Sequence, residues 1–309
     1  MINLITGGNG FVGSHLIEHL LAQSPSDAIH SLDRESVAKP PVIGHHCDLR
    51  DADGVRRVID EVRPDRIYHL AGFARASGEK GVPENFENNT LTTLALLDTI
   101  AALDKPVTLF LASSAHVYGN QVNPVDEESP TLPVSPYGFS KMLAERAAQR
   151  ATEQCPRLHV VVGRLSNCIG PGQGPGFVVA DFAHRLHELL ANGGTQLETG
   201  PLDARRSFMD VRDLVTLLPR LLDGPQASRF EIYNLASPDS HTIREMVEQL
   251  IALTGKPISL KVKTETAPNA FAGLVVKTDK LQHLLHPSFR ALGETLKDTL
   301  ENEMRGSSK

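Results

Sequence analysis

The first thirteen residues constrain the fold of this chain more than any other segment. Residues 2–5 form a short apolar run, a glycine-rich turn follows at once, and residues 14–22 have a helical pattern. In this context the glycines permit a tight turn, a close approach of the backbone to a pyrophosphate, and close packing of the helix on the strand. The segment predicts a dinucleotide-binding turn made of Gly7, Gly10, Phe11, Val12 and Gly13.

The rest of the chain predicts an α/β protein with a doubly wound parallel sheet, because apolar strands and amphipathic helices alternate along it. We expect strands at residues 2–6, 28–32, 41–45, 66–70, 107–112 and 158–165, and helices at 51–62, 86–103 and 136–154. A run rich in glycine and proline at residues 170–176 indicates a loop. We therefore expect a dinucleotide-binding domain at residues 1–165, to which a segment near 208–236 returns, and a smaller α/β substrate-binding region at 166–309.

Tyr137 and Lys141 are the clearest pair of candidate catalytic residues. Ser135 and Pro136 form a helix-start signal, so that two residues four positions apart share one helix face. A phenol is a weak acid near neutral pH, and a neighbouring ammonium favours its ionised form. Two hydroxyls, Ser113 and Ser114, follow an apolar strand, and ligands bind beyond the carboxyl ends of such strands.

The spacing from Gly7-x-x-Gly10-x-x-Gly13 through Ser114 to Tyr137-x-x-x-Lys141 resembles the extended short-chain dehydrogenase/reductase family. Within it, the likeness is to the NAD-dependent epimerases, dehydratases and reductases of nucleotide sugars, which have a Rossmann fold. Residues 164–172 and 205–213 resemble further segments of the same family, so that the resemblance spans nearly the whole chain. It implies an oxidoreductase or epimerase that uses NAD or NADP and binds a nucleotide sugar.

The resemblance also implies roles for single residues. Ser114 would bond the reacting oxygen, Tyr137 would exchange its proton, and Lys141 would hold the nicotinamide ribose and lower the pKa of Tyr137. Ser114 is favoured over Ser113 because the family pattern counts four residues to the tyrosine of Val-Tyr-Gly, here Tyr118. Sugar 4,6-dehydratases of the family have a glutamate where this chain has His116, which disfavours a dehydratase and leaves reduction or 4-epimerisation.

Cofactor choice depends on the end of the second expected strand. Asp33 can bond both ribose hydroxyls and repel a 2′-phosphate, whereas Arg34 can hold that phosphate. NAD is favoured over NADP. By resemblance, the remaining cofactor contacts are Asp48, Leu49, Leu70, Ala71, Gly72 and Asn89.

Residues 174–182 resemble the corresponding segment of bacterial GDP-4-keto-6-deoxymannose reductases, which form GDP-rhamnose. The best expectation is therefore a 4-ketoreductase; a 4-epimerase and a non-catalytic NAD(P)-binding regulator are the alternatives. Arg206 is the first candidate for the substrate diphosphate because a guanidinium binds phosphate oxygens through several donors. The candidate substrate-binding residues are His116, Asn167, Phe177, Val178, Val179, Arg205 and Arg206.

Composition and short motifs limit the other possibilities. The net charge of −6 argues against a nucleic-acid-binding protein. The three cysteines lack metal-ligand spacing, and the His15-x-x-Glu18-His19 pattern lies on the helix after the glycine turn, so we expect no metal. No apolar run is long enough to span a membrane, and we expect a cytoplasmic protein. Likeness to the family implies a homodimer that pairs residues 86–103 and 136–154 of each copy.

Overall fold

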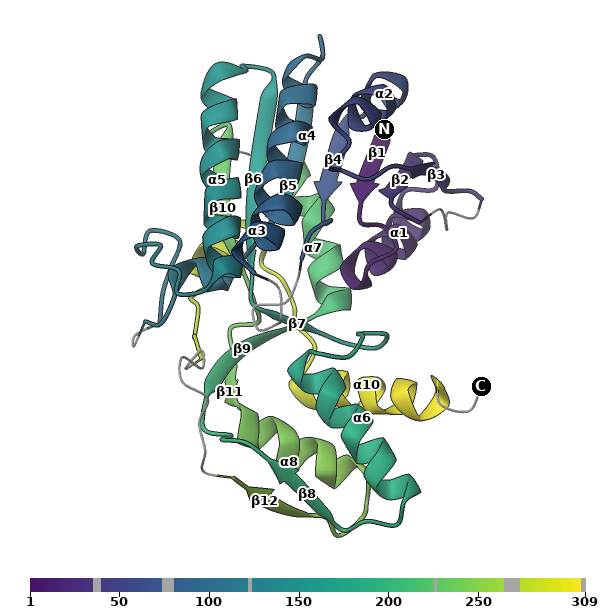
Figure 1. Cartoon of the computed structure of the whole chain (residues 1–309), viewed down its shortest axis with the longest axis vertical. Helices are drawn as coiled ribbons and strands as arrows, with labels where there is room; N and C mark the ends of the chain where they lie inside the picture. The colour runs from purple at the N-terminus through teal and green to yellow at the C-terminus, as the bar shows by residue number, and fades with distance from the viewer. Residues whose placement is uncertain (36–39, 74–80, 122–123, 225–226, 264–272, 307–309) are drawn as a thin grey trace.

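The computed structural model of the chain describes residues 1–35, 40–73, 81–121, 124–224, 227–263 and 273–306. Within them, parallel strands form one seven-stranded sheet in the order β10-β6-β5-β4-β1-β2-β3 (Figure 1). The expected α/β class and doubly wound sheet are confirmed. The strands are β1 (Ile2–Thr6), β2 (Ala28–Asp33), β3 (Ile43–His46), β4 (Arg66–His69), β5 (Val107–Ser114), β6 (Leu158–Leu165) and β10 (Phe230–Leu235).

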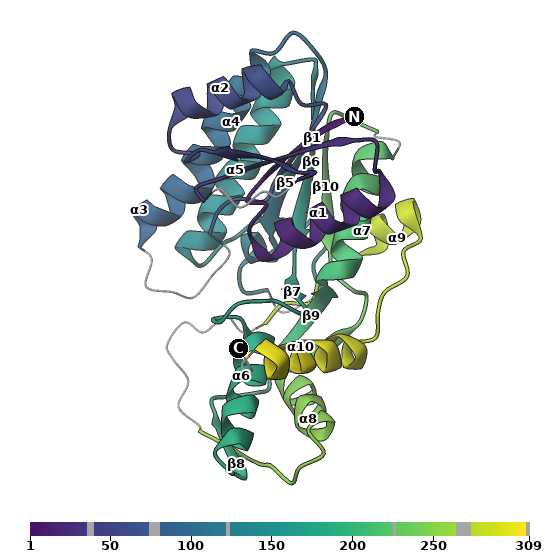
Figure 2. The ribbon, with the colours of Figure 1, turned by 90° about the vertical axis from the view of Figure 1, so that its right-hand side faces the viewer.

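Helices cover both faces of this sheet, as Figure 2 shows. One face packs against α2 (Ala52–Val62), α4 (Thr92–Ala101) and α5 (Pro136–Gln154). The other packs against α1 (Phe11–Gln23), α7 (Val211–Asp223) and α9 (Asp279–Leu285). Because both faces are buried, the central strands β5 and β6 are apolar along most of their length, as is typical of parallel sheets.

Several expected elements differ in their bounds by one or two residues. Strand β3 begins two residues later than expected, and β5 ends two residues later, so that it includes Ser113 and Ser114. The helix expected at residues 86–103 is preceded by α3 (Val82–Asn85) and begins with a π-helical segment, η1 (Phe86–Leu91), before α4. Asn89 lies in this wider turn, where its side chain accepts a hydrogen bond from the N–H of Phe73 and donates one to Ser140. These side-chain bonds join distant segments, so helical periodicity alone does not show them.

A smaller region lies below the sheet in Figure 1. It contains the sheet β11-β9-β7, the pair β12-β8, and three helices that enclose an apolar core of their own. Its elements are β7 (Asn167–Ile169), β8 (Gln196–Thr199), β9 (Arg205–Asp210), β11 (Ser240–Thr242), β12 (Ser259–Val262), α6 (Val178–Ala191), α8 (Ile243–Leu253) and α10 (Leu292–Gly306).

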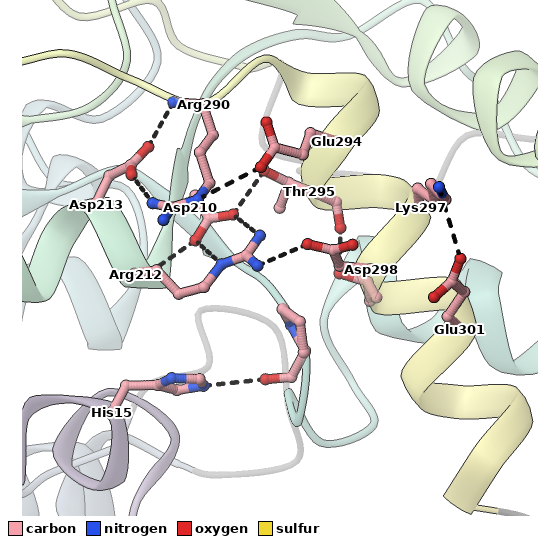
Figure 3. Close-up of polar contacts among 12 residues, drawn as sticks. His15, Asp210, Arg212, Asp213, Arg290, Glu294, Thr295, Lys297, Asp298 and Glu301 are labelled. Atoms are coloured by element: carbon pink, nitrogen blue, oxygen red, sulfur yellow. Dashed lines mark hydrogen bonds and ion pairs between the residues drawn. The ribbon is translucent and has the colours of Figure 1, made fainter. Parts of the chain in front are cut away.

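Ion pairs tie α10 to the junction between β9 and α7 (Figure 3). The carboxylate of Asp210 is buried and accepts hydrogen bonds from Arg212 at 2.7 Å and from Thr295 at 2.7 Å. Arg212 also donates to Asp298 at 2.6 Å, and Arg290 pairs with Asp213. This network links the smaller region to a helix that covers the large sheet.

None of the helices in the described ranges combines the length and the apolarity that a membrane crossing requires.

Candidate active site

One cavity of about 750 Å³ lies at the carboxyl ends of the central strands. The glycine turn and the ends of β5 and β6 form its upper wall, and residues of β7, β9 and the start of α6 form its lower wall. Its size is that of a site for a small molecule or cofactor. Most of the residues that the sequence singled out line it: Gly7, Gly10, Phe11, Val12, Gly13, Leu70, Gly72, Ser114, His116, Tyr137, Lys141, Asn167, Phe177, Val178 and Arg206.

The glycine turn has the shape that a pyrophosphate site requires. Gly7 has a φ of +75°, and a Cβ there would lie 2.8 Å from the backbone nitrogen of Ala71. A Cβ on Gly13 would lie 2.1 Å from the carbonyl oxygen of Gly7. Helix α1 follows directly, and no side chain caps its first turn. Its free N–H groups and helix dipole suit an anion, so these residues fit the phosphates of a dinucleotide.

Ser114 and Tyr137 meet at the end of β5. Tyr137 is 7% exposed, and the Ser114 side chain is the polar group that acts on the pKa of its phenol. Ser114 also accepts a hydrogen bond from the N–H of His116 at 3.2 Å. The imidazole of His116 packs edge-on against the Tyr137 ring, with the ring centres 5.6 Å apart. The competing hydroxyl of Ser113 is bonded instead to Glu145. Ser114 is therefore the serine whose side chain lowers the pKa of the phenol.

The pKa of Tyr137 differs from what the sequence suggested. Burial raises it, and the group that lowers it in part is Ser114 rather than Lys141. The ammonium of Lys141 donates to the carbonyl oxygen of Ala112 at 2.9 Å, and burial lowers the pKa of this lysine to about 8. Without a bound coenzyme, the lowering comes from Ser114 and not from Lys141, so the effect of Lys141 on Tyr137 stays a prediction for the protein with coenzyme bound.

Several expected cofactor contacts lie around the glycine turn. The carboxylate of Asp33 accepts bonds from the N–H of Asn9 at 3.0 Å and from Ser31 at 3.2 Å, and Arg34 is exposed beside it. Asp48 pairs with Arg50. The side chain of Leu49 is buried in the apolar core, so only its backbone is available to a ligand. Ala71 packs against Gly7.

On the substrate side, Arg206 is partly buried and forms no ion pair with any of the described residues. Its Nε atom is inaccessible and has no hydrogen-bond partner among the described residues. Burial lowers the pKa of Arg206. The pKa of His116 is lowered to about 4 by its own burial and by the charge of Arg206. An inaccessible donor without an acceptor is costly, so Arg206 fits an anionic group of a ligand. Asn167 donates to the carbonyl oxygen of Ser207 at 3.0 Å and also lines the cavity.

Two expected substrate contacts lie elsewhere. Neighbouring residues of a strand point to opposite faces, so Arg205 faces away from the cavity that Arg206 lines. The Arg205 side chain is exposed and donates hydrogen bonds to Ser240 and Glu245. Val179 is fully buried in the core of the smaller region. The expectation that Arg205 and Val179 face the substrate is therefore wrong.

The sequence interpretation missed cavity residues that adjoin the recognised motifs. Phe73 follows Gly72, Ser166 precedes Asn167, and Gln173 lies in the loop rich in glycine and proline. Their position next to those motifs was the only sequence signal that they line the cavity. Val134 and Leu274 also line the cavity, and nothing in their local sequence marks them.

Comparison with known proteins places this geometry in a family. The NAD dependent epimerase/dehydratase family model matches residues 3–236. GDP-6-deoxy-D-mannose reductase of Pseudomonas aeruginosa is 33% identical over 80% of this chain and 78% of its own length. The structure of RMD from Pseudomonas aeruginosa complexed with NADPH is 26% identical, with a TM-score of 0.82 over 98% of this chain and 99% of that one. Thermus thermophilus UDP-glucose 4-epimerase, in complex with NAD, is 28% identical, with a TM-score of 0.86 over 99% and 100%.

Proposed function

Because the chain belongs to the NAD dependent epimerase/dehydratase family, we propose that it is a nucleotide-sugar 4-ketoreductase. Its substrate is a nucleotide-linked 4-keto-6-deoxyhexose, with GDP-4-keto-6-deoxymannose as the first candidate and GDP-rhamnose as the product. NADH or NADPH is the reductant. The GDP-sugar is suggested by the similarity to GDP-6-deoxy-D-mannose reductase.

One observation carries the proposal. The side chains of Ser114 and Tyr137 line the same cavity as the glycine turn and Arg206, whose Nε has no hydrogen-bond partner among the described residues. A proton donor, a dinucleotide-binding turn and a cation for a diphosphate are the three components that reduction of a nucleotide-linked ketone requires.

His116 supports reduction over dehydration. An elimination needs a base that removes a carbon-bound proton, and a base is most effective when its pKa is near the working pH. Burial and Arg206 lower the pKa of His116 to about 4. The imidazole is therefore a weak base, and its place beside Tyr137 is better suited to contact with the sugar.

The residues of this chain provide orientation and the proton. Ser114 donates a hydrogen bond to the ketone oxygen, and Tyr137 gives that oxygen its hydroxyl proton. Lys141 stabilises the resulting phenolate and holds the nicotinamide ribose. Arg206 binds the diphosphate, and Asn167 bonds the sugar or the diphosphate. A reduced nicotinamide, when bound, supplies the hydride to the carbonyl carbon.

The reaction is tested with GDP-, UDP-, dTDP- and CDP-linked 4-keto sugars and each reduced coenzyme. We expect one equivalent of coenzyme to be oxidised for each 4-keto sugar consumed, with the GDP-linked substrate preferred. Conversion of a 4-hydroxy sugar without added coenzyme, by protein purified with bound NAD, would instead identify a 4-epimerase. Absence of turnover with every sugar, despite tight coenzyme binding, would favour a regulator.

Coenzyme preference is expected to depend on Asp33. We predict that the wild-type protein binds NADH more tightly than NADPH, and that Asp33→Ser shifts the ratio toward NADPH by about tenfold, or about 1.4 kcal/mol. Loss of the carboxylate removes its repulsion of a 2′-phosphate. Arg34→Ala should shift the ratio the other way. Fluorescence titration with both coenzymes measures the ratio, and an unchanged ratio in Asp33→Ser would exclude this role.

The pH dependence of coenzyme binding should follow Lys141. Burial disfavours the charged form of an amine, and it lowers the pKa of Lys141 to about 8. The ammonium is therefore present below about pH 8 and is lost as the pH rises through that value. We expect affinity for NADH, and kcat/KM for the sugar, to decline above about pH 8. Titrations from pH 6 to 10 test this, and a flat profile would contradict it.

We also propose a homodimer formed through the outer surfaces of α3, η1, α4 and α5. The apolar side chains Val82, Leu91, Leu94 and Phe139 are exposed on these neighbouring segments (Figure 1). Leu91→Glu is expected to yield a monomer by light scattering, whereas Leu253→Glu, at an exposed position on α8, should not. A monomeric wild-type protein at micromolar concentration would contradict this proposal.

A further inference from the structure

A buried cluster of three polar side chains lies directly behind the catalytic residues. Ser113 and Arg164 are opposite each other in the register of β5 and β6, and both side chains contact Glu145 on α5. Arg164 donates to this carboxylate through Nε at 3.1 Å and through Nη2 at 2.8 Å. The three residues are 3–4% exposed. The Glu145 carboxylate is therefore held by two strands at once.

Glu145 and Lys141 are one helical turn apart on α5, so that they share a face of the helix. Lys141 donates to the carbonyl oxygen of Ala112, and Glu145 accepts from the hydroxyl of Ser113. The helix thus contacts two consecutive residues of β5, and the next residue is Ser114. These contacts join the serine at the end of β5 to the helix that carries Tyr137.

We propose that Glu145 is a positioning residue for the reaction. Its carboxylate holds the end of β5 through Ser113, and it supplies the buried negative charge that stabilises the Lys141 ammonium. This proposal rests on the proposed function in one respect, namely that Lys141 binds the nicotinamide ribose of the coenzyme.

The charges around Lys141 support this assignment. Burial lowers the pKa of Lys141, and the Glu145 carboxylate opposes that change. His69, on β4, is fully buried, and burial together with Lys141 lowers its pKa to about 3, so that it stays neutral. Glu145 is therefore the negative group that acts on the ammonium. The titratable and charged groups near this position are Tyr137 and Glu145 on α5, His69 on β4, His116 beside Tyr137, and Arg164 behind Glu145.

Stability alone is a weak reason for such a pair. Removing two ions from water costs about as much as their attraction returns, and a buried ion pair can often be replaced by apolar residues without loss of stability. Arg164 also donates to the hydroxyl of Tyr118 at 2.9 Å, which anchors the ion pair to the short helix η2 (Ala115–Tyr118) that follows Ser114. The pair therefore contacts the segments on both sides of Ser114.

The test measures the titration of Lys141 directly. NMR of protein labelled with ¹³C at the lysine ε-carbon follows its pKa, and Lys141→Met assigns the signal. Glu145→Gln keeps a hydrogen-bond acceptor for Ser113 but removes the negative charge. This single substitution leaves the cation of Arg164 unpaired, so the double variant Glu145→Gln/Arg164→Met removes that cation as well. Ser113→Ala is the matched control, because it deletes one hydrogen bond and keeps both charges.

We expect the pKa of Lys141 to fall by about one unit in both Glu145 variants, and to stay near the wild-type value in Ser113→Ala. The decline in NADH affinity should move to lower pH by the same amount. If Glu145→Gln does not fold, the double variant decides. A folded double variant in which Lys141 titrates as in the wild type would overturn the proposal. The titration needs no sugar, so a failure of the proposed substrate would leave this result intact.

Discussion

Replacing Tyr137 with phenylalanine is expected to lower kcat for ketone reduction by about 1,000-fold, within the range that a positioned general acid contributes. The change removes one oxygen atom and keeps the ring, which packs against His116. Coenzyme affinity should therefore change by less than about threefold, because the aromatic contact and Lys141 remain. Steady-state kinetics and NADH titration on the same preparation measure both quantities.

The matched control is Tyr233→Phe. Tyr233 lies on β10, outside the residues that line the cavity, and its ring contacts the ammonium of Lys280. This variant should turn over at nearly the wild-type rate. If Tyr137→Phe is as active as Tyr233→Phe, Tyr137 is not the proton donor.

Arg206→Met is expected to raise the KM for the nucleotide sugar by about 100-fold, which corresponds to about 2.7 kcal/mol. The guanidinium is partly buried, and its inaccessible Nε has no hydrogen-bond partner among the described residues, so an anionic ligand would gain a charged partner that has already lost part of its water. Methionine fills much of the same space without the charge. Affinity for NADH should stay near the wild-type value, and this separates the two halves of the cavity.

The neighbouring arginine provides the control for this change. Arg205→Met removes an exposed side chain that bonds Ser240 and Glu245, and its KM should remain within about threefold of the wild type. Equal effects of the two substitutions would show that overall charge, rather than a diphosphate contact, accounts for the change.

The parts of the fold that depend on local sequence could be predicted. The strand, glycine turn and helix at the amino terminus are such a part, and so is α5, whose start is capped as expected by Ser135. The short strands of the smaller region were missed in part because β7, β9 and β11 contain three to six residues and form one sheet only after the chain has folded. Such elements have too few residues for a reliable periodic pattern.

In the candidate active site, too, the features that depend on tertiary structure could not be predicted from the sequence. The sequence makes Arg206 the first candidate but keeps Arg205 as a second one, because no strand is expected from it at residues 205–210. The alternation along β9 places Arg206 at the cavity and Arg205 on the opposite face. The cluster of Ser113, Glu145 and Arg164 depends on the register of two strands that lie far apart in sequence. The state of Tyr137 depends on its burial, and a four-residue spacing contains no information about burial.

The central claim is that this chain reduces the 4-keto carbon of a nucleotide-linked 6-deoxyhexose. Its most direct test uses GDP-4-keto-6-deoxymannose with coenzyme that carries deuterium at the transferable position of the nicotinamide. Mass spectrometry and NMR of the product then locate the label. We predict one deuterium at C4 of the sugar for each coenzyme oxidised. A product without deuterium at C4, or conversion without net oxidation of the coenzyme, would contradict the account.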